Sequence, residues 1–229
     1  MEESRRNFLI GSSAAITGTI VTPFSALAAP PQKKKQEKEQ EDDVSTNEDL
    51  MREHGVLNRV LLIYDEANRR IAGGKADFDP EVVNKAAGLI KKFIEEYHEK
   101  LEENYLFPRF EKANKLADLT KVLRAQHAAG RTVTGRIISS VKSKDLQAAG
   151  TAMAAFVRMY RPHESREDTV LFPALHSIVS KHEYDALGEE FDKIEQKTFG
   201  GDGFDMAVDQ VTALEKQIGI YDLAQFTPK

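Results

Sequence analysis

The sequence predicts an all-α protein: an up-down-up-down four-helix bundle with additional C-terminal helices. Three observations predict it. From residue 48 onward, apolar residues recur at the three- and four-residue spacing of a helix, and no stretch alternates as a half-buried strand would. Glycine and proline stop and start these stretches at helix-length intervals. The 229 residues, 41% hydrophobic and 30% charged, can bury a core and cover it. Short connections then favour antiparallel neighbours.

Residues 1–29 have the pattern of an export signal rather than of a folded element. Arg5 and Arg6 directly precede a moderately apolar stretch, and residues 26–28 read Ala-Leu-Ala, a small-x-small cleavage site. The pattern resembles a twin-arginine signal, which implies transport of a folded, cofactor-loaded protein to the periplasm. Polar and glycine residues interrupt the stretch, so we expect no stable membrane span after cleavage. An uncleaved membrane anchor is the alternative.

Residues 30–47 are predicted to be a flexible charged linker. The segment is almost free of apolar residues, so it cannot bury enough surface to offset the entropy lost on ordering. Its lysine run at 33–35 is followed at once by acidic residues, which favours a solvated tether over a nucleic-acid or lipid patch. The net charge of −5 also argues against nucleic-acid binding.

Four helices are expected between residues 48 and 198, the predicted bundle domain. The first stops at Gly73, and the second opens with Asp79 as N-cap and Pro80 at the first helical position. The third is expected over about 116–141 and the fourth over about 143–180.

Two further apolar stripes follow, at 184–194 and 204–218, with a glycine-rich break between them. We expect these stripes to cover the bundle, with residues 199–229 forming a C-terminal helical extension. No motif of nucleotide binding or serine-hydrolase chemistry is present in the sequence.

One block of residues occurs twice without a gap, at 98–108 and 163–173. Both copies share the pattern His-Glu-x-x-Glu, then an acidic residue, then Leu-Phe-Pro after two further positions. A histidine and a glutamate four residues apart lie on one face of an α-helix, one turn apart. One such pair is commonly a surface pair, but each copy is also preceded by another histidine, at position 54 or 127, a helix and a loop earlier.

These groups predict a metal site. Antiparallel helices would bring them to one level of the bundle, where polar groups without a metal would be buried at high cost. Cysteine is absent, so the ligands must come from histidine, carboxylate or tyrosine side chains. The predicted ligands are His54, His98, Glu102, His127, His163 and Glu167.

Over about residues 48–198 the chain resembles the hemerythrin-like, or HHE cation-binding, proteins. The resemblance rests on the paired His-x3-Glu motifs with their trailing Leu-Phe-Pro. It implies a four-helix bundle that holds two non-haem iron ions, one served by His54 and His98 and the other by His127 and His163. Glu102 and Glu167 would bridge the two ions. Mixed nitrogen and oxygen ligands suit iron, with manganese or zinc as alternatives.

The chain departs from the oxygen-carrying members of that family at one position. Those members have a fifth histidine where this chain has Arg131. The loss leaves either an open coordination position or a carboxylate substitute, and Glu99 and Glu164 are the candidates for the substitute. A solvated helix face is the alternative for both, because a one-residue step turns a side chain about 100° away.

The missing histidine favours reactivity or sensing over reversible oxygen carriage. We expect a diiron protein that binds or senses a small molecule such as oxygen, nitric oxide or peroxide. The alternatives are a diiron oxidase or peroxidase, and an iron-handling or structural bundle stabilised by its metal. Nothing in the sequence names a protein partner. Four neighbouring side chains could support the ligands, or could be ordinary solvated or core residues: Glu103, Tyr105, Tyr160 and Asp168.

Overall fold

The computed structural model describes residues 44–228. The predicted signal at 1–29 and nearly all of the predicted linker lie outside the described residues. Within 44–228 the chain forms helices and no strand, which confirms the predicted all-α bundle with additional C-terminal helices. No helix in this range is long and apolar enough to cross a membrane.

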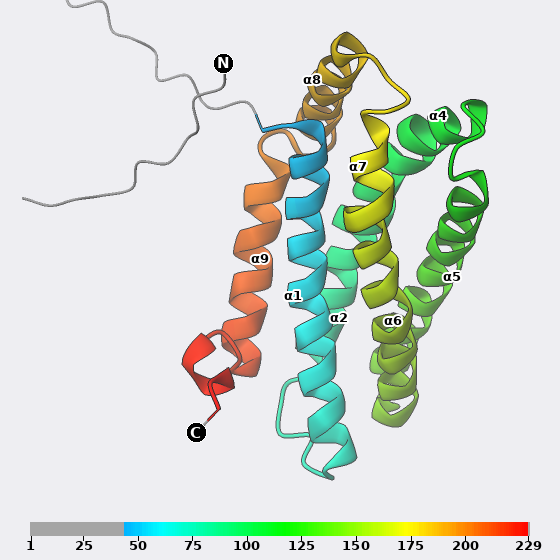
Figure 1. Cartoon of the computed structure of the whole chain (residues 1–229). Helices are drawn as coiled ribbons and strands as arrows, with labels where there is room; N and C mark the ends of the chain where they lie inside the picture. Colours follow the sequence, from blue (N-terminus) through cyan, green and yellow to red (C-terminus); the bar gives the residue numbers. More distant parts are fainter. Residues whose placement is uncertain (1–43, 229) are drawn as a thin grey trace, which may run out of the picture. The chain divides into compact units, whose positions relative to one another are not determined.

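Four rods of helix form the bundle (Figure 1). The first rod is α1, and the third is α5. The second and fourth rods are each built from consecutive helical segments. In chain order the segments are α1 (Thr46–Ala72), then α2 (Glu81–Leu89), η1 (Ile90–His98), α3 (Glu99–Leu101), η2 (Glu102–Leu106) and α4 (Phe107–Lys112), then α5 (Ala117–Lys142), and then α6 (Leu146–Arg166), η3 (Glu167–Leu171) and α7 (Phe172–Leu175).

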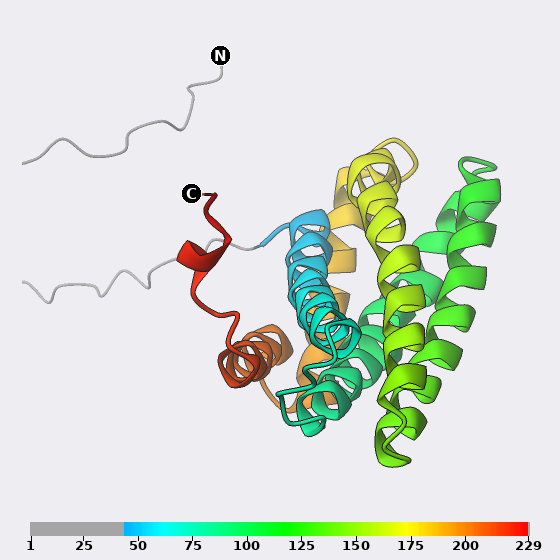
Figure 2. The same ribbon diagram turned by 90° about the horizontal axis from the view of Figure 1, so that it is seen from below.

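Two further helices follow the bundle, α8 (Lys181–Phe199) and α9 (Gly203–Ile218), and a short 3₁₀ turn, η4 (Leu223–Phe226), follows them. Helix α9 packs along α1 and α2, as the view from below shows (Figure 2). Arg59 of α1 holds it there through two hydrogen bonds to Glu215, of 3.0 and 2.5 Å, and one to Thr212 of 2.7 Å.

Helix α1 begins at Thr46, two residues before the predicted start of the bundle domain at residue 48. The side chain of Ser45 accepts a hydrogen bond from the backbone N–H of Glu48, which satisfies one of the free donors at the helix start. The hydroxyl of Thr46 donates to the carbonyl of Tyr184 in α8 at 3.0 Å. Both contacts order residues that composition alone assigned to the linker.

The predicted fourth helix also differs at its two ends. Ser143 ends α5 instead of starting α6, because Lys144 adopts a left-handed conformation with φ of 61°. Asp145 is the N-cap of α6, where its side chain accepts from the N–H of Ala148 at 2.9 Å. Ser180 caps α8 in a capping box with Glu183, so the fourth rod ends earlier than expected.

Three segments of the bundle are π-helical rather than α-helical: η1, η2 and η3. They contain three of the predicted ligands, namely His98, Glu102 and Glu167. A π-helix forms hydrogen bonds between residues five apart and occurs mainly as short bulges, often at functional sites. The helical rods are therefore locally widened where the candidate ligands point into the bundle.

Candidate metal centre

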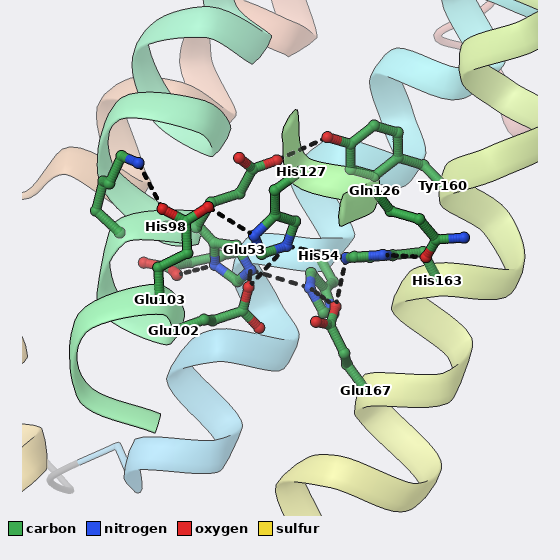
Figure 3. A network of polar contacts seen from close by, with 12 residues as sticks. Glu53, His54, His98, Glu102, Glu103, Gln126, His127, Tyr160, His163 and Glu167 are labelled. Carbon is green, nitrogen blue, oxygen red and sulfur yellow. Dashed lines mark hydrogen bonds and ion pairs between the residues drawn. The ribbon is translucent and has the colours of Figure 1, made fainter. Parts of the chain in front are cut away.

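The structure brings all six predicted ligands together in the middle of the bundle (Figure 3). Each rod contributes at least one of them. Their exposed fractions range from 0 to 4%, so the site lies in the interior of the protein. The six side chains and their elements are His54 of α1, His98 of η1, Glu102 of η2, His127 of α5, His163 of α6 and Glu167 of η3.

The ligand atoms form two groups, each of two histidines and one glutamate. In each group the three atoms lie within 4.8 Å of one another. The Nε2 atoms of His54 and His98 are 3.0 Å apart. Those of His127 and His163 are 3.2 Å apart. This pairing is the one that the family resemblance implies.

Each glutamate lies between the two groups. Glu102 Oε2 is 3.8 Å from Nε2 of His98 and 3.4 Å from Nε2 of His127. Glu167 Oε2 is 3.0 Å from Nε2 of His163 and 3.5 Å from Nε2 of His54. A carboxylate with one histidine of each group on either side is in the position that a bridge between two cations requires.

A polar side chain contacts the Nδ1 atom of each of the four candidate ligand histidines. His98 Nδ1 lies 2.6 Å from a Glu53 oxygen, and His54 Nδ1 lies 2.7 Å from an Asp168 oxygen. With a carboxylate or amide oxygen as the acceptor, Nδ1 carries the proton and Nε2 of a neutral ring presents its lone pair to the centre. The remaining two contacts are His127 Nδ1 with Glu103 Oε1 at 3.1 Å and His163 Nδ1 with Gln126 Oε1 at 2.9 Å.

This arrangement fits a pair of cations. When the rings of His54 and His98 are both neutral, no proton separates their facing Nε2 lone pairs. All four carboxylate oxygens of Glu102 and Glu167 are buried without a hydrogen-bond partner. Buried polar atoms are ordinarily satisfied, and a buried carboxylate without a partner is costly. Cations between the histidines and the glutamates would satisfy all of these atoms at once.

The pKa shifts of these residues also fit a metal site. Burial, reinforced by the facing Glu167, raises the pKa of Glu102 well above its usual range. Burial opposes ionisation of Glu167 too, but the neighbouring imidazoles of His163, His54 and His127 outweigh it and lower its pKa. Burial, together with the other three imidazoles, holds the pKa of His98 well below its usual value. A neutral imidazole is the form that binds a metal.

An aromatic ring supports each of the histidines that precede the repeated blocks. The ring of Phe107 stacks on His127 with centroids 5.5 Å apart, and Phe172 stacks on His54 at 5.4 Å. The Leu-Phe-Pro tail of each block thus packs against a histidine of another rod. This contact gives the repeated phenylalanine a structural role.

Arg131, at the place of the missing histidine, is bound to two carboxylates. Its guanidinium donates to Glu99 Oε2 at 2.6 Å and to Glu103 Oε1 at 2.7 Å. The hydroxyl of Tyr160 donates to the other oxygen of Glu99 at 2.6 Å. Glu99, Glu103 and His127 are close enough to form a third cation-binding group, but the guanidinium supplies the positive charge there.

A solvated helix face is the wrong interpretation for both Glu99 and Glu164, which are 1% and 3% exposed. Both oxygens of Glu99 are taken by Arg131 and Tyr160, whereas Glu164 Oε2 is buried without a partner. Burial raises the pKa of Glu99 to about 8 despite these contacts, and that of Glu164 to about 7. Tyr105 packs on Phe191.

Sequence reasoning missed Glu53 and Gln126, although a signal for them exists. Each residue immediately precedes a lone histidine and contacts the histidine of the block that follows. Glu103 and Asp168, which follow the two glutamates, contact the lone histidines. The internal repeat therefore extends to the groups that orient the imidazoles, with a carboxylate at 53 where the other half has an amide.

Comparison with known proteins agrees with this geometry. Relatives that are 48% identical over 191 residues occur in Mycobacterium bovis and in two strains of Mycobacterium tuberculosis. The alignment covers 81% of this chain and 74% of each relative, and all three are described as uncharacterised proteins. No solved structure matches the chain significantly. The Hemerythrin HHE cation binding domain matches residues 45–175. The chain therefore belongs to the hemerythrin HHE cation-binding family.

Proposed function

We propose that this protein holds two non-haem iron ions and uses them to bind or sense a small molecule such as oxygen, nitric oxide or peroxide. One observation carries the proposal. Four histidine Nε2 atoms and two unpartnered glutamates converge in the bundle as two groups, and each glutamate lies between the groups. Nitrogen and carboxylate ligands without thiolate favour iron, with manganese or zinc as the alternatives.

In this proposal the protein's own residues bind the ions and orient the imidazole rings. The Nε2 atoms of the four histidines would ligate the ions, while their Nδ1 partners fix the ring orientation and tautomer. When bound, two iron ions would supply a coordination position and an electron source for the small molecule. Arg131, turned to Glu99 and Glu103, offers no nitrogen ligand, so a coordination position would stay open for the small molecule.

We also propose that the protein is exported through the twin-arginine route. The paired Arg5 and Arg6 and the Ala-Leu-Ala site at 26–28 support it. A tagged full chain should be recovered from the periplasm, and an Arg5→Lys, Arg6→Lys double variant should stay in the cytoplasm. Equal export of the two chains would contradict the proposal.

The test of the metal proposal is metal content per chain, combined with an optical spectrum before and after reduction and exposure to nitric oxide or oxygen. We expect two irons and a ligand-to-metal band that changes on exposure. Zinc, or an iron pair whose spectrum changes with neither gas nor with reductant, would favour the structural alternative. Steady turnover of peroxide would favour the enzymatic one.

Variants assign the ligands in the same assay. His98→Ala and Glu102→Ala should each lose at least one metal per chain, because each removes a buried ligand. The matched control is His182→Ala, since His182 is an exposed residue of α8. Retention of two metals by both ligand variants would refute the assignment.

A further inference from the structure

The two repeated blocks differ in what covers their acidic residues beside the candidate centre. The first block has Glu99 and Glu103, four residues apart, and the second block has Glu164 and Asp168 at the same places. The six candidate ligands are at most 4% exposed, so an ion that loads the centre needs a route from solvent. A carboxylate that is not already neutralised would favour such a route for a cation.

Donor groups cover the acidic pair of the first block completely. The Arg131 guanidinium donates to both Glu99 and Glu103. The Lys100 ammonium donates to the second oxygen of Glu103 at 2.5 Å. The hydroxyl of Tyr160 donates to the second oxygen of Glu99. This pair is therefore neutralised, and every one of its carboxylate oxygens is already bound.

The acidic pair of the second block lacks both of these cations. Counted from the histidines, Asn58 stands at the place of Arg131, and Ser165 stands at the place of Lys100. The side chains of Asn58 and Ser165 donate to backbone carbonyls of their own helices, at 3.2 and 2.7 Å. The repeat thus keeps the acidic residues in both halves but keeps the neutralising cations in only one.

No other basic side chain replaces them. Of the arginines and lysines in the described part of the chain, none forms an ion pair with Glu164 or Asp168. Arg161, which precedes Glu164 on α6, is paired with Asp65 of α1 instead. The negative charge of this acidic pair is therefore available to a cation from outside.

Glu164 and Asp168 lie between solvent and the candidate centre. The side chain of Asp168 is 31% exposed, and one of its oxygens is 2.7 Å from Nδ1 of His54. Glu164 is 3% exposed, and its Oε2 is buried without a hydrogen-bond partner. Burial raises the pKa of Glu164 to about 7, while His54 opposes the shift and Asp168 adds to it, so this carboxylate lies near both.

We propose that ferrous ions enter the centre between α1 and α6, by way of Asp168 and then Glu164. The inference rests on the proposed function, because it supplies the route by which iron reaches that site. The exposed carboxylate of Asp168 attracts the hydrated ion, and the buried carboxylate of Glu164 replaces part of its water. The positive charge of Arg131 opposes entry on the side of the first block.

The test is the rate at which the metal-free full chain takes up ferrous ion in the absence of oxygen. Samples quenched with an excess of a chromophoric chelator report the iron that is not yet bound. Glu164→Gln should take up iron about tenfold more slowly, because it removes one charge of the route, and should still bind two ions at equilibrium. Glu99→Gln is the matched control at the same place of the first block, and it should keep the wild-type rate.

A second variant covers the acidic pair without removing either carboxylate. Asn58→Arg places a guanidinium four residues after His54, as Arg131 stands four residues after His127, and position 58 is exposed. Uptake should slow about tenfold, because the new cation neutralises the pair. Asn58→Met is the control, since it adds length without charge and should leave the rate unchanged.

Metal content at equilibrium, measured on the same preparations, separates this proposal from the proposed function. Equal uptake rates in the wild type, Glu164→Gln and Asn58→Arg, each ending at two irons per chain, would overturn the route and keep the diiron centre. Equal slowing in Glu99→Gln and Glu164→Gln, or only one iron bound by Glu164→Gln, would also overturn the route. A wild type that binds no iron would refute the proposed function and the route with it.

Discussion

Each candidate ligand histidine is held at both ring nitrogens, one facing the centre and the other facing an orienting side chain. Three of the orienting groups are carboxylates, at Glu53, Glu103 and Asp168, and the fourth is the amide of Gln126. A carboxylate makes the imidazole that it binds more basic, so the two halves of the centre differ in the strength of their ligands.

Replacing one orienting carboxylate should weaken metal binding without removing a ligand. In Glu53→Ala, His98 loses the acceptor 2.6 Å from its Nδ1, so ring orientation and tautomer are no longer fixed. We expect affinity for one metal to fall by about 10- to 100-fold. A competition titration with a chromophoric chelator measures it. Glu48→Ala, at an exposed site of the same helix, is the control, and equal affinities in both variants would contradict the assigned role.

The buried Glu99 predicts a pH dependence of stability in the metal-free protein. Burial raises its pKa to about 8 in the folded chain, above the usual value of 4.5. Between these two pKa values the folded state holds a proton on Glu99 that the unfolded state releases. The resulting stabilisation of the folded chain is fully present below about pH 4.5 and is lost as the pH rises through 8.

Urea unfolding of the metal-free wild type and of Glu99→Gln, from pH 5 to 9, measures this contribution. The variant cannot ionise at this position, so its stability should fall less over that range than the stability of the wild type. Identical pH profiles for the two chains would show that Glu99 does not carry the effect.

At the scale of elements, the sequence predicts the helices well but does not predict where they become π-helical. Apolar spacing, Gly73 and the Asp79-Pro80 start anticipate the bundle, because these signals depend on residues within one helix. Asp79 accepts from the N–H of Glu81 at 2.9 Å, but α2 begins at Glu81 with Pro80 as its N-cap, one residue later than predicted. The π-helical segments were not anticipated, because apolar spacing does not distinguish hydrogen bonds between residues five apart from those between residues four apart.

The candidate site also combines features that lie within one helix, which the sequence predicts, and features that depend on packing between helices. The four-residue step selects the candidate pairs His98–Glu102 and His163–Glu167, because it is a property of one helix. The distance of a helix plus a loop then adds His54 and His127. The orienting pairs join residues far apart in the chain, such as Glu53 with His98, and only the packing of rods brings them together. The second carboxylate contact of Arg131 and the position of Tyr160 depend on the same packing.

Helix α5 packs closely against α6 at Gly130, where a Cβ would lie 2.0 Å from the Tyr160 hydroxyl. Gly130→Ala should push Tyr160 away from Glu99 and reduce the free energy of unfolding by about 1–3 kcal/mol. Gly135→Ala in the same helix is the matched control, because its Cβ meets nothing within 4 Å and alanine favours helix by about 1 kcal/mol. Equal urea midpoints for the two variants would contradict the close packing.

At the scale of the whole molecule, the candidate centre joins all four rods of the bundle. His54, His98, His127 and His163 each come from a different rod, so a bound metal pair would connect segments that are far apart in sequence. Unfolding would separate the ligands and release the metals. The free energy of metal binding therefore adds to the stability of the entire bundle.

Removal of the metals should lower the thermal stability of the bundle as a unit. A ligand present at about 1,000 times its dissociation constant adds about 4 kcal/mol to the free energy of unfolding. Circular dichroism melts of the metal-loaded and chelator-treated chain should show a lower midpoint after chelation, restored by adding back iron. An unchanged midpoint would mean that the metals do not bind at a site shared by the four rods.

The most direct test of the central claim is anomalous X-ray scattering from crystals of the iron-loaded chain, measured at the iron absorption edge. We expect two peaks inside the bundle, one beside the Nε2 atoms of His54 and His98 and one beside those of His127 and His163, with Glu102 and Glu167 contacting both. A single peak, or peaks outside these six residues, would contradict the dinuclear centre.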